Sequence, residues 1–221
     1  MKLHLKSIRD SIPIFVWLVT GIIALLAVAA VFIDSLVKVP AFANAAAILD
    51  PSLARVNKGN NPDALVHVVV FGDYECPNTK TDWPMIQSIR RSYGDQINLV
   101  YWQFPSNRHL NARAAALAAY CADIQNQFWE YSDLLFEHQN RLQQPDLVTY
   151  AKQLGLDTHE FSVCLGSDAA AQNVEDAVIG ALGHGIKGTP TYIINGRRFE
   201  GVQEEVMLRN IIDAALKAVE E

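Results

Sequence analysis

Two largely apolar runs stand out in the first third of the chain. Residues 12–33 carry no charge, and a helix of about 20 apolar residues spans a hydrocarbon layer about 30 Å thick. Residues 65–71, Leu-Val-His-Val-Val-Val-Phe, are rich in β-branched side chains and follow a cluster of turn-forming residues. The first run predicts a membrane span, and the second predicts a strand buried on both faces of a sheet.

A helix is predicted directly after this strand. Pro77 suits the first helical position because its missing N–H costs nothing there, and this places Cys76 at the cap. Apolar side chains then recur at helical spacing until Gly94-Asp95. Residues 97–104 read as a second strand, which completes a strand–helix–strand unit of the parallel type.

The pattern becomes alanine-rich and amphipathic between about residues 107 and 183, which predicts a helical insertion. In residues 111–125 we expect Ala114, Leu117, Ala118 and Cys121 to share the buried face. Asp157, with Glu160 three residues later, resembles a capping box that opens a helix carrying Cys164. The predicted helical stretches are 111–125, 128–139, 145–155, 157–165 and 168–182.

The last part of the chain predicts a hairpin and a helix. Tyr192-Ile193-Ile194 is joined to residues 198–201 by Asn195-Gly196, and Asn-Gly is the strongest short signal for a hairpin. Residues 203–219 form an amphipathic helix. The predicted fold class is therefore α/β, preceded by one transmembrane helix.

Positive charges indicate on which side of the membrane each end of the predicted span lies. Lys2, Lys6 and Arg9 precede it, so we expect residues 1–11 in the cytoplasm, a span at 12–33, a linker at 34–61 and an extracytoplasmic domain at 62–221. A buried core helix is one alternative. A cleaved secretory signal is the other, because Ala41-Phe42-Ala43 has the small-x-small form of a cleavage site.

The charge and the cysteine count limit the kinds of partner that the protein can bind. Eighteen Lys and Arg face 24 Asp and Glu, a net charge of −6, which argues against binding to nucleic acid. The compartment outside the membrane is oxidising, so at most two of the three cysteines pair internally and one thiol is left over. We find no spacing typical of a metal site.

Cys76-Pro77-Asn78-Thr79 resembles a dithiol redox motif whose second sulfur has become a hydroxyl. Unpaired N–H groups and the dipole at a helix N-terminus stabilise a thiolate, and the Thr79 hydroxyl can donate a hydrogen bond back to the sulfur. The nearby carboxylates Asp73 and Glu75 oppose this, so we expect moderate activation. The alternatives are an inert half-buried Cys76 and a Thr79 that only fills the first helical turn.

The order of the elements resembles the DsbA-like branch of the thioredoxin fold, from about residue 59 to the end. The resemblance implies a thioredoxin-like fold with an inserted helical subdomain and a cis bond before Pro190, beside the active sulfur. It also implies that Thr189, Pro77 and Asn78 contact a bound peptide. The segments that carry it are 59–64, 71–77, 104–121, 128–131 and Gly188-Thr189-Pro190-Thr191.

Two residues depart from the family pattern. Thr79 stands in place of the resolving cysteine, and Val70 stands where many members carry a buried glutamate. Both absences remove the same step, which favours natural loss of the dithiol cycle. Cys76 can then form a mixed disulfide, but an external thiol such as glutathione must release it.

Cys121 and Cys164 have three possible states. Similar pairs in DsbA-like proteins form a structural disulfide, while two buried reduced thiols or a redox role remain as alternatives. His109 and His184 are the histidines that can approach the site, each with either a polar loop role or a proton-transfer role.

Three functions are compatible with these residues. The first is an extracytoplasmic thiol–disulfide oxidoreductase or isomerase that uses Cys76, Thr79 and Pro190 on cysteine-containing proteins. The second is a chaperone-like peptide-binding module without dithiol activity. The third is a glutathione-dependent transferase, against which the retention of Cys76 counts.

Overall fold

The computed structural model describes residues 61–220. The predicted cytoplasmic segment, the membrane span and all of the linker but its last residue lie outside these residues. Within the described part of the chain, no helix is both long enough and apolar enough to cross a membrane.

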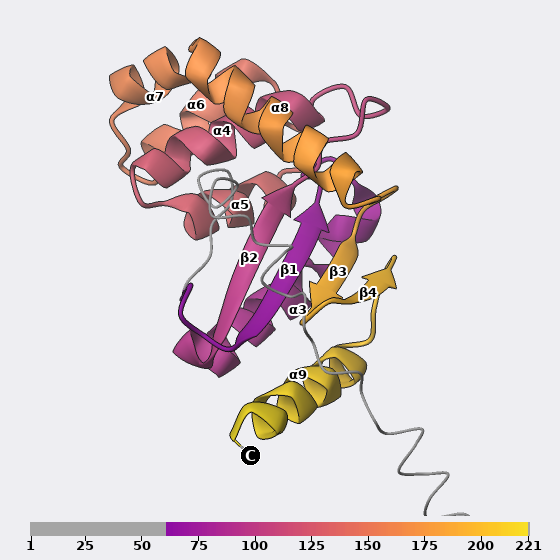
Figure 1. Cartoon of the computed structure of the whole chain (residues 1–221). Helices are drawn as coiled ribbons and strands as arrows, with labels where there is room; N and C mark the ends of the chain where they lie inside the picture. The colour runs from indigo at the N-terminus through magenta and orange to yellow at the C-terminus, as the bar shows by residue number, and fades with distance from the viewer. Residues whose placement is uncertain (1–60, 221) are drawn as a thin grey trace, which may run out of the picture. The chain divides into compact units, whose positions relative to one another are not determined.

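A four-stranded sheet with the order β2-β1-β3-β4 forms the centre of the domain (Figure 1). β1 (Val66–Gly72) pairs in parallel with β2 (Ile97–Gln103), and β3 (Thr191–Ile194) pairs antiparallel with both β1 and β4 (Arg197–Glu200). β1 and β2 are buried almost throughout. The predicted central strand, parallel unit and C-terminal hairpin are therefore confirmed.

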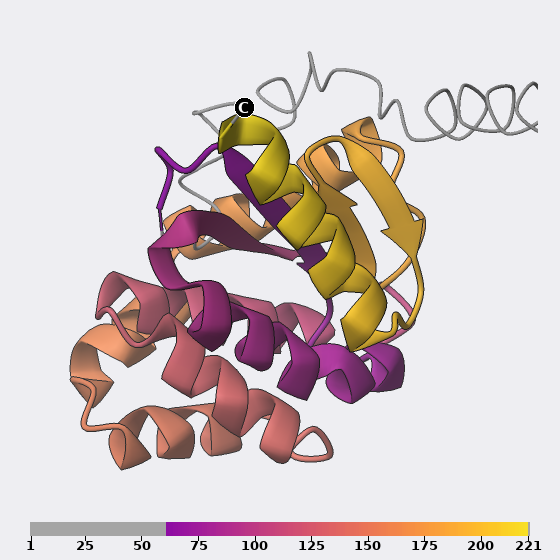
Figure 2. The same cartoon turned by 90° about the horizontal axis from the view of Figure 1, so that it is seen from below.

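Helices cover both faces of the sheet. α3 (Pro77–Tyr93) and α9 (Glu205–Glu220) pack on one face, as Figure 2 shows from below, together with alternate side chains of β1 and β2. α8 (Asp168–Gly183) packs on the other face against Val69, Phe71, Val100 and Trp102. Successive side chains of a strand point to opposite faces of the sheet. Because helices cover both faces, most positions of β1 and β2 are buried, and their sequences are therefore mostly apolar.

The predicted helical insertion is present between β2 and β3. Asp157 caps α7 by accepting hydrogen bonds from the N–H groups of His159 and Glu160. Cys121 and Cys164 form a disulfide that joins α4 to α7, with 5.8 Å between their Cα atoms. The helices of the insertion are α4 (Ala112–Ile124), α5 (Phe128–Glu137), α6 (Gln144–Gln153), α7 (Thr158–Leu165) and α8.

The buried face of α4 differs from the predicted one. Ala118 and Cys121 are buried as expected, but Ala114 and Leu117 are only partly buried. Ala115 and Ala119 lie fully inside instead. Alanine is small enough for close packing on most of the helix surface, because α4 contacts α5, α6, α7 and α8, so the apolar periodicity alone misplaces the face by part of a turn.

Candidate functional site

Cys76 lies at the N-cap of α3 with an extended backbone, and its side chain caps none of the helical N–H groups. It is the free cysteine of the described residues and is only 6% exposed. Its thiol donates to the carbonyl oxygen of Thr189, with 3.4 Å between Sγ and O. The peptide bond between Thr189 and Pro190 is cis. The fold thus brings Thr189 and Pro190 to Cys76 across more than a hundred residues.

The loop between β1 and α3 is fixed from the helical insertion. The Gln139 side chain donates hydrogen bonds of 2.9 Å to the carbonyl oxygens of both Tyr74 and Cys76. The Cys76 N–H donates to the carbonyl oxygen of Asp73 at 3.1 Å. These bonds hold the backbone that carries the sulfur, because both the N–H and the carbonyl oxygen of Cys76 have partners.

Asp73 ties this loop to the segment after β2. Its buried carboxylate accepts from the N–H of Glu75 through Oδ1 and from the N–H of Ser106 through Oδ2, both at 2.8 Å. His109 Nδ1 lies 2.7 Å from the same Oδ2. Glu75 accepts from the backbone and side chain of Asn111. Both carboxylates that the sequence placed near the sulfur are therefore engaged with other groups.

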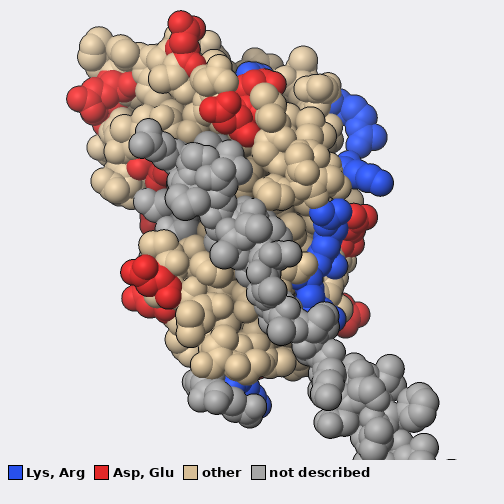
Figure 3. Space-filling view, viewed as in Figure 1, with Lys and Arg blue, Asp and Glu red and all other residues tan. Residues whose placement is uncertain are grey.

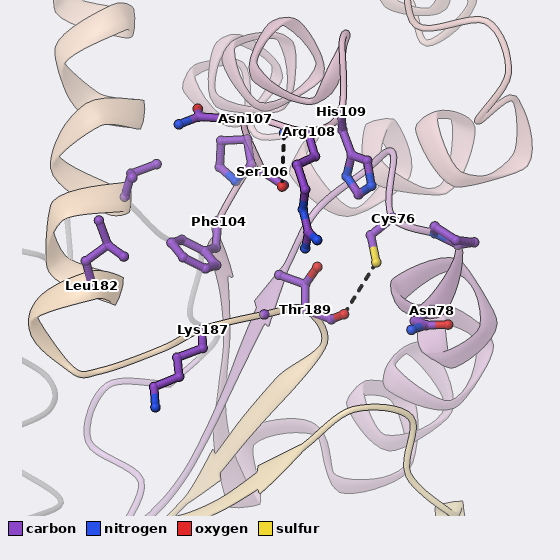
Figure 4. A pocket seen from close by; sticks show the side chains of 14 residues that line it. Cys76, Asn78, Phe104, Ser106, Asn107, Arg108, His109, Leu182, Lys187 and Thr189 are labelled. Atoms are coloured by element: carbon purple, nitrogen blue, oxygen red, sulfur yellow. Dashed lines mark hydrogen bonds between the residues drawn. The ribbon is translucent and has the colours of Figure 1, made fainter.

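The two candidate histidines are separated by the fold. His109 lies beside Cys76 in the wall of the cavity described below, held by Asp73 (Figure 4). His184 packs edge-on against Trp102 and does not line that cavity.

Thr79 has a different partner from the expected one. Its hydroxyl is fully buried and accepts from the Asp73 N–H at 3.5 Å, and the structure shows no hydrogen bond between Thr79 and Cys76. Thr79 is fully buried and does not line the cavity, whereas Cys76 does. Thr79 thus supports the loop beneath Cys76.

Two tyrosines flank Val70 beneath the site. Val70 is paired in register with Tyr101 of β2 and Tyr192 of β3. The Tyr192 hydroxyl donates to Asp82, but the buried Tyr101 hydroxyl has no hydrogen-bond partner among the described residues. Burial raises the pKa of Tyr101 well above its ordinary value, and the neighbouring Tyr74 and Asp73 add to this effect. Tyr101 therefore stays protonated.

Gly72 makes room for this phenol. A Cβ at position 72 would lie 2.2 Å from the Tyr101 hydroxyl oxygen. Sequence reasoning assigned no role to Tyr101, although a glycine that ends a buried strand indicates a close approach of another group.

A cavity of about 720 Å³ opens beside the sulfur (Figure 4). The three residues predicted to contact substrate, Pro77, Asn78 and Thr189, all line it together with Cys76. Cys121 and Cys164 lie in the insertion and form their own bridge. Sequence reasoning missed Phe104, Arg108, Leu182 and Lys187, which complete much of the wall. No cluster of residues suited to a metal ion occurs among residues 61–220.

Comparison with known proteins shows the family to which the chain belongs. Residues 58–214 match the model of a family described as "Thioredoxin". The chain belongs to this thioredoxin family. Its thioredoxin domain is 32% identical over 169 residues to a Na(+)/H(+) antiporter NhaA 1 from Mycolicibacterium gilvum, and 37% identical over 140 residues to one from Salinispora arenicola. These matches cover 75% and 63% of this chain but only 27% and 21% of the relatives, so the chain spans about a quarter of their length.

Solved structures share the fold of the thioredoxin domain. A thioredoxin-like oxidoreductase from Silicibacter pomeroyi superposes with a TM-score of 0.66 at 23% identity, covering 77% of this chain and 95% of that one. Oxidised BdbD from Bacillus subtilis superposes with a TM-score of 0.63 at 24% identity, covering 72% and 91%. These similarities establish a thioredoxin-like α/β fold with a helical insertion.

Proposed function

We propose that this protein carries out thiol–disulfide exchange through the single sulfur of Cys76. The observation that carries the proposal is the place of that sulfur. It is a free thiol at the N-terminus of α3, beside the cis bond of Pro190, and it lines a cavity. Disulfide exchange needs a free sulfur that a client disulfide can reach, and Cys76 supplies one at the wall of this cavity.

The proposed reaction uses Cys76 and the residues around it. The Cys76 thiolate attacks one sulfur of a client disulfide, a bond forms between the two sulfurs, and the other client sulfur leaves as a thiolate. Thr189 and Pro190 hold the client segment beside Cys76, while Pro77 and Asn78 contact it from α3. Thr79 offers no second sulfur, so an external thiol such as glutathione completes the exchange.

The proposed setting is the extracytoplasmic side of a membrane, with residues 12–33 as the tether. The charge-free run supports the tether, and the Cys121–Cys164 disulfide supports an oxidising compartment. The relatives named as Na(+)/H(+) antiporters, proteins that act at a membrane, contain a segment like this domain. The proposed partners are cysteine-containing proteins on that side of the membrane.

The test is covalent trapping in native membranes with the full chain. Wild-type protein and Cys76→Ser are compared by non-reducing electrophoresis after alkylation of free thiols. We expect client adducts with the wild type alone, and their release by glutathione. A third variant, Thr79→Cys, restores a second sulfur and should lower the amount of trapped adduct, because that sulfur displaces the client.

A peptide-binding module without exchange activity is the second candidate. The observation that favours it is the missing second thiol next to an intact cavity with apolar residues. If wild type and Cys76→Ser retain the same clients without a covalent bond, the exchange function is wrong and the binding function stands.

A further inference from the structure

The cavity beside Cys76 carries two cationic side chains in a chain whose net charge is negative. Arg108 and Lys187 contribute to its wall, and no Asp or Glu among the described residues lines it. The whole chain has a net charge of −6. Basic side chains on the face shown in Figure 3 likewise gather along one edge, on the side where β3 and β4 lie in Figure 1.

The charges of Arg108 and Lys187 are available to a ligand. Within residues 61–220, no carboxylate lies at ion-pair distance from either side chain. The nearest acids in sequence to the sulfur, Asp73 and Glu75, are held by backbone N–H groups, and Asp73 is also paired with His109. Neither acid forms an ion pair with Arg108 or Lys187.

The view into the cavity shows how the two cations are arranged (Figure 4). Arg108 extends from the loop after β2 toward Thr189, on the side where Cys76 lies, whereas Lys187 lies on the other side of Thr189. Phe104 lies between them in this view, and Pro105 and Leu182 add further apolar surface to the wall. A volume of about 720 Å³ falls within the range of about 300–1,000 Å³ that holds small molecules.

We propose that this cavity binds the external thiol that the exchange requires, and that this thiol is a small peptide-like molecule with carboxylate groups. Arg108 and Lys187 would pair with its carboxylates while its sulfur faces Cys76. Guanidinium groups suit carboxylates because their donors form a planar fork. The proposal rests on the function proposed above, and it adds the class of co-substrate.

The sulfur chemistry balances with two molecules of the small thiol. The first, as a thiolate, attacks Sγ of Cys76 in the mixed disulfide, and the client sulfur leaves as a thiolate that takes up a proton. Cys76 is then joined to the small thiol. A second molecule attacks the sulfur of the first, a disulfide of the two small thiols leaves, and Cys76 returns as a thiolate. The client disulfide is reduced and the small thiol is oxidised.

The test measures selectivity among thiols of different charge. Cys76 of the full chain in detergent is converted to a 2-thiopyridyl mixed disulfide, and its removal is followed with glutathione, neutral 2-mercaptoethanol and cationic cysteamine. Each rate is corrected for the thiolate fraction and divided by the rate with a free 2-thiopyridyl disulfide. We expect glutathione to be preferred, with a preference that falls as salt is added.

Single-charge variants locate the effect. Arg108→Gln and Lys187→Gln should each lower the glutathione rate by about twofold to fivefold, the range of an exposed ion pair, and leave the 2-mercaptoethanol rate unchanged. Lys152→Gln on the exposed surface of α6 is the matched control and should change neither rate. Circular dichroism confirms that each variant is folded.

Equal corrected rates for the three thiols, or equal losses in Lys152→Gln and Arg108→Gln, would overturn this assignment. Such a result leaves the exchange function intact, because client trapping by Cys76 is measured separately. Conversely, absence of client adducts refutes the exchange function, even if glutathione removes the 2-thiopyridyl group faster than the other thiols do.

Discussion

Removing one hydroxyl beneath the site should stabilise the protein. Tyr101 is fully buried, its hydroxyl has no hydrogen-bond partner among the described residues, and burial keeps the phenol protonated. Tyr101→Phe removes only this hydroxyl. Tyr131→Phe is the matched control, because Tyr131 is equally buried but its hydroxyl donates to the Leu147 carbonyl oxygen at 2.8 Å.

The expected magnitudes have opposite signs. A buried polar group without a partner costs about 1–3 kcal/mol, which Tyr101→Phe recovers. The oxygen also makes dispersion contacts worth about 0.1–0.2 kcal/mol each, and a handful of them offsets less than 1 kcal/mol. We therefore expect a gain of about 1 kcal/mol. Tyr131→Phe should lose about 1 kcal/mol, the typical net value of one hydrogen bond.

Urea unfolding followed by circular dichroism measures both changes. With a slope of about 2 kcal/mol per molar, each variant should move the midpoint by about 0.5 M, upward for Tyr101→Phe and downward for Tyr131→Phe. If both variants lower the midpoint equally, the Tyr101 hydroxyl has an acceptor and the reasoning is refuted.

Three further predictions concern the groups around this core. Replacing both Cys121 and Cys164 by Ala should lower the free energy of unfolding by about 4 kcal/mol, because their sequence separation of 43 closes a long loop; the wild type in reductant should match the variant, and an unchanged midpoint would show that the bridge contributes nothing. Asp73→Asn should cost about 1–3 kcal/mol in urea unfolding, because both of its oxygens accept backbone hydrogen bonds and an amide keeps only one acceptor; a neutral effect would contradict the double acceptance. Burial raises the pKa of Asp82 above 3.8, so its proton is held more tightly in the folded state, and stability should fall as pH rises from about 4 through the raised pKa. Asp82→Asn should remove this fall, since both hydrogen bonds to Asp82 end on Oδ2 and the amide oxygen can accept them; an unchanged pH dependence would assign it to another group.

The local pattern was sufficient for the elements of the domain. The Val-rich run predicted β1, and Pro77 predicted the start of α3 with Cys76 at its cap. Asn195-Gly196 predicted the turn between β3 and β4. Each of these signals acts within a few residues, through backbone dihedrals or side-chain periodicity, so it can be read without knowing the fold.

The local pattern was less informative about faces and partners. It misplaced part of the buried face of α4, because alanine packs closely in several directions. It assigned the Thr79 hydroxyl to Cys76, whereas the structure pairs it with Asp73. Both errors concern which group a side chain meets, and that depends on elements distant in the sequence.

The sequence by itself determined that Cys76 stands at a helix N-terminus, with Thr79 where a second thiol would stand. Only the tertiary structure decided what surrounds it, namely Thr189 with its cis bond to Pro190, the Asp73–His109 pair, and the cavity with Arg108 and Lys187. The physical reason is that a helix cap is a local property of the backbone. A cavity is formed by residues from the start of α3, the loop after β2, α8 and the loop before β3, and folding alone brings these segments together.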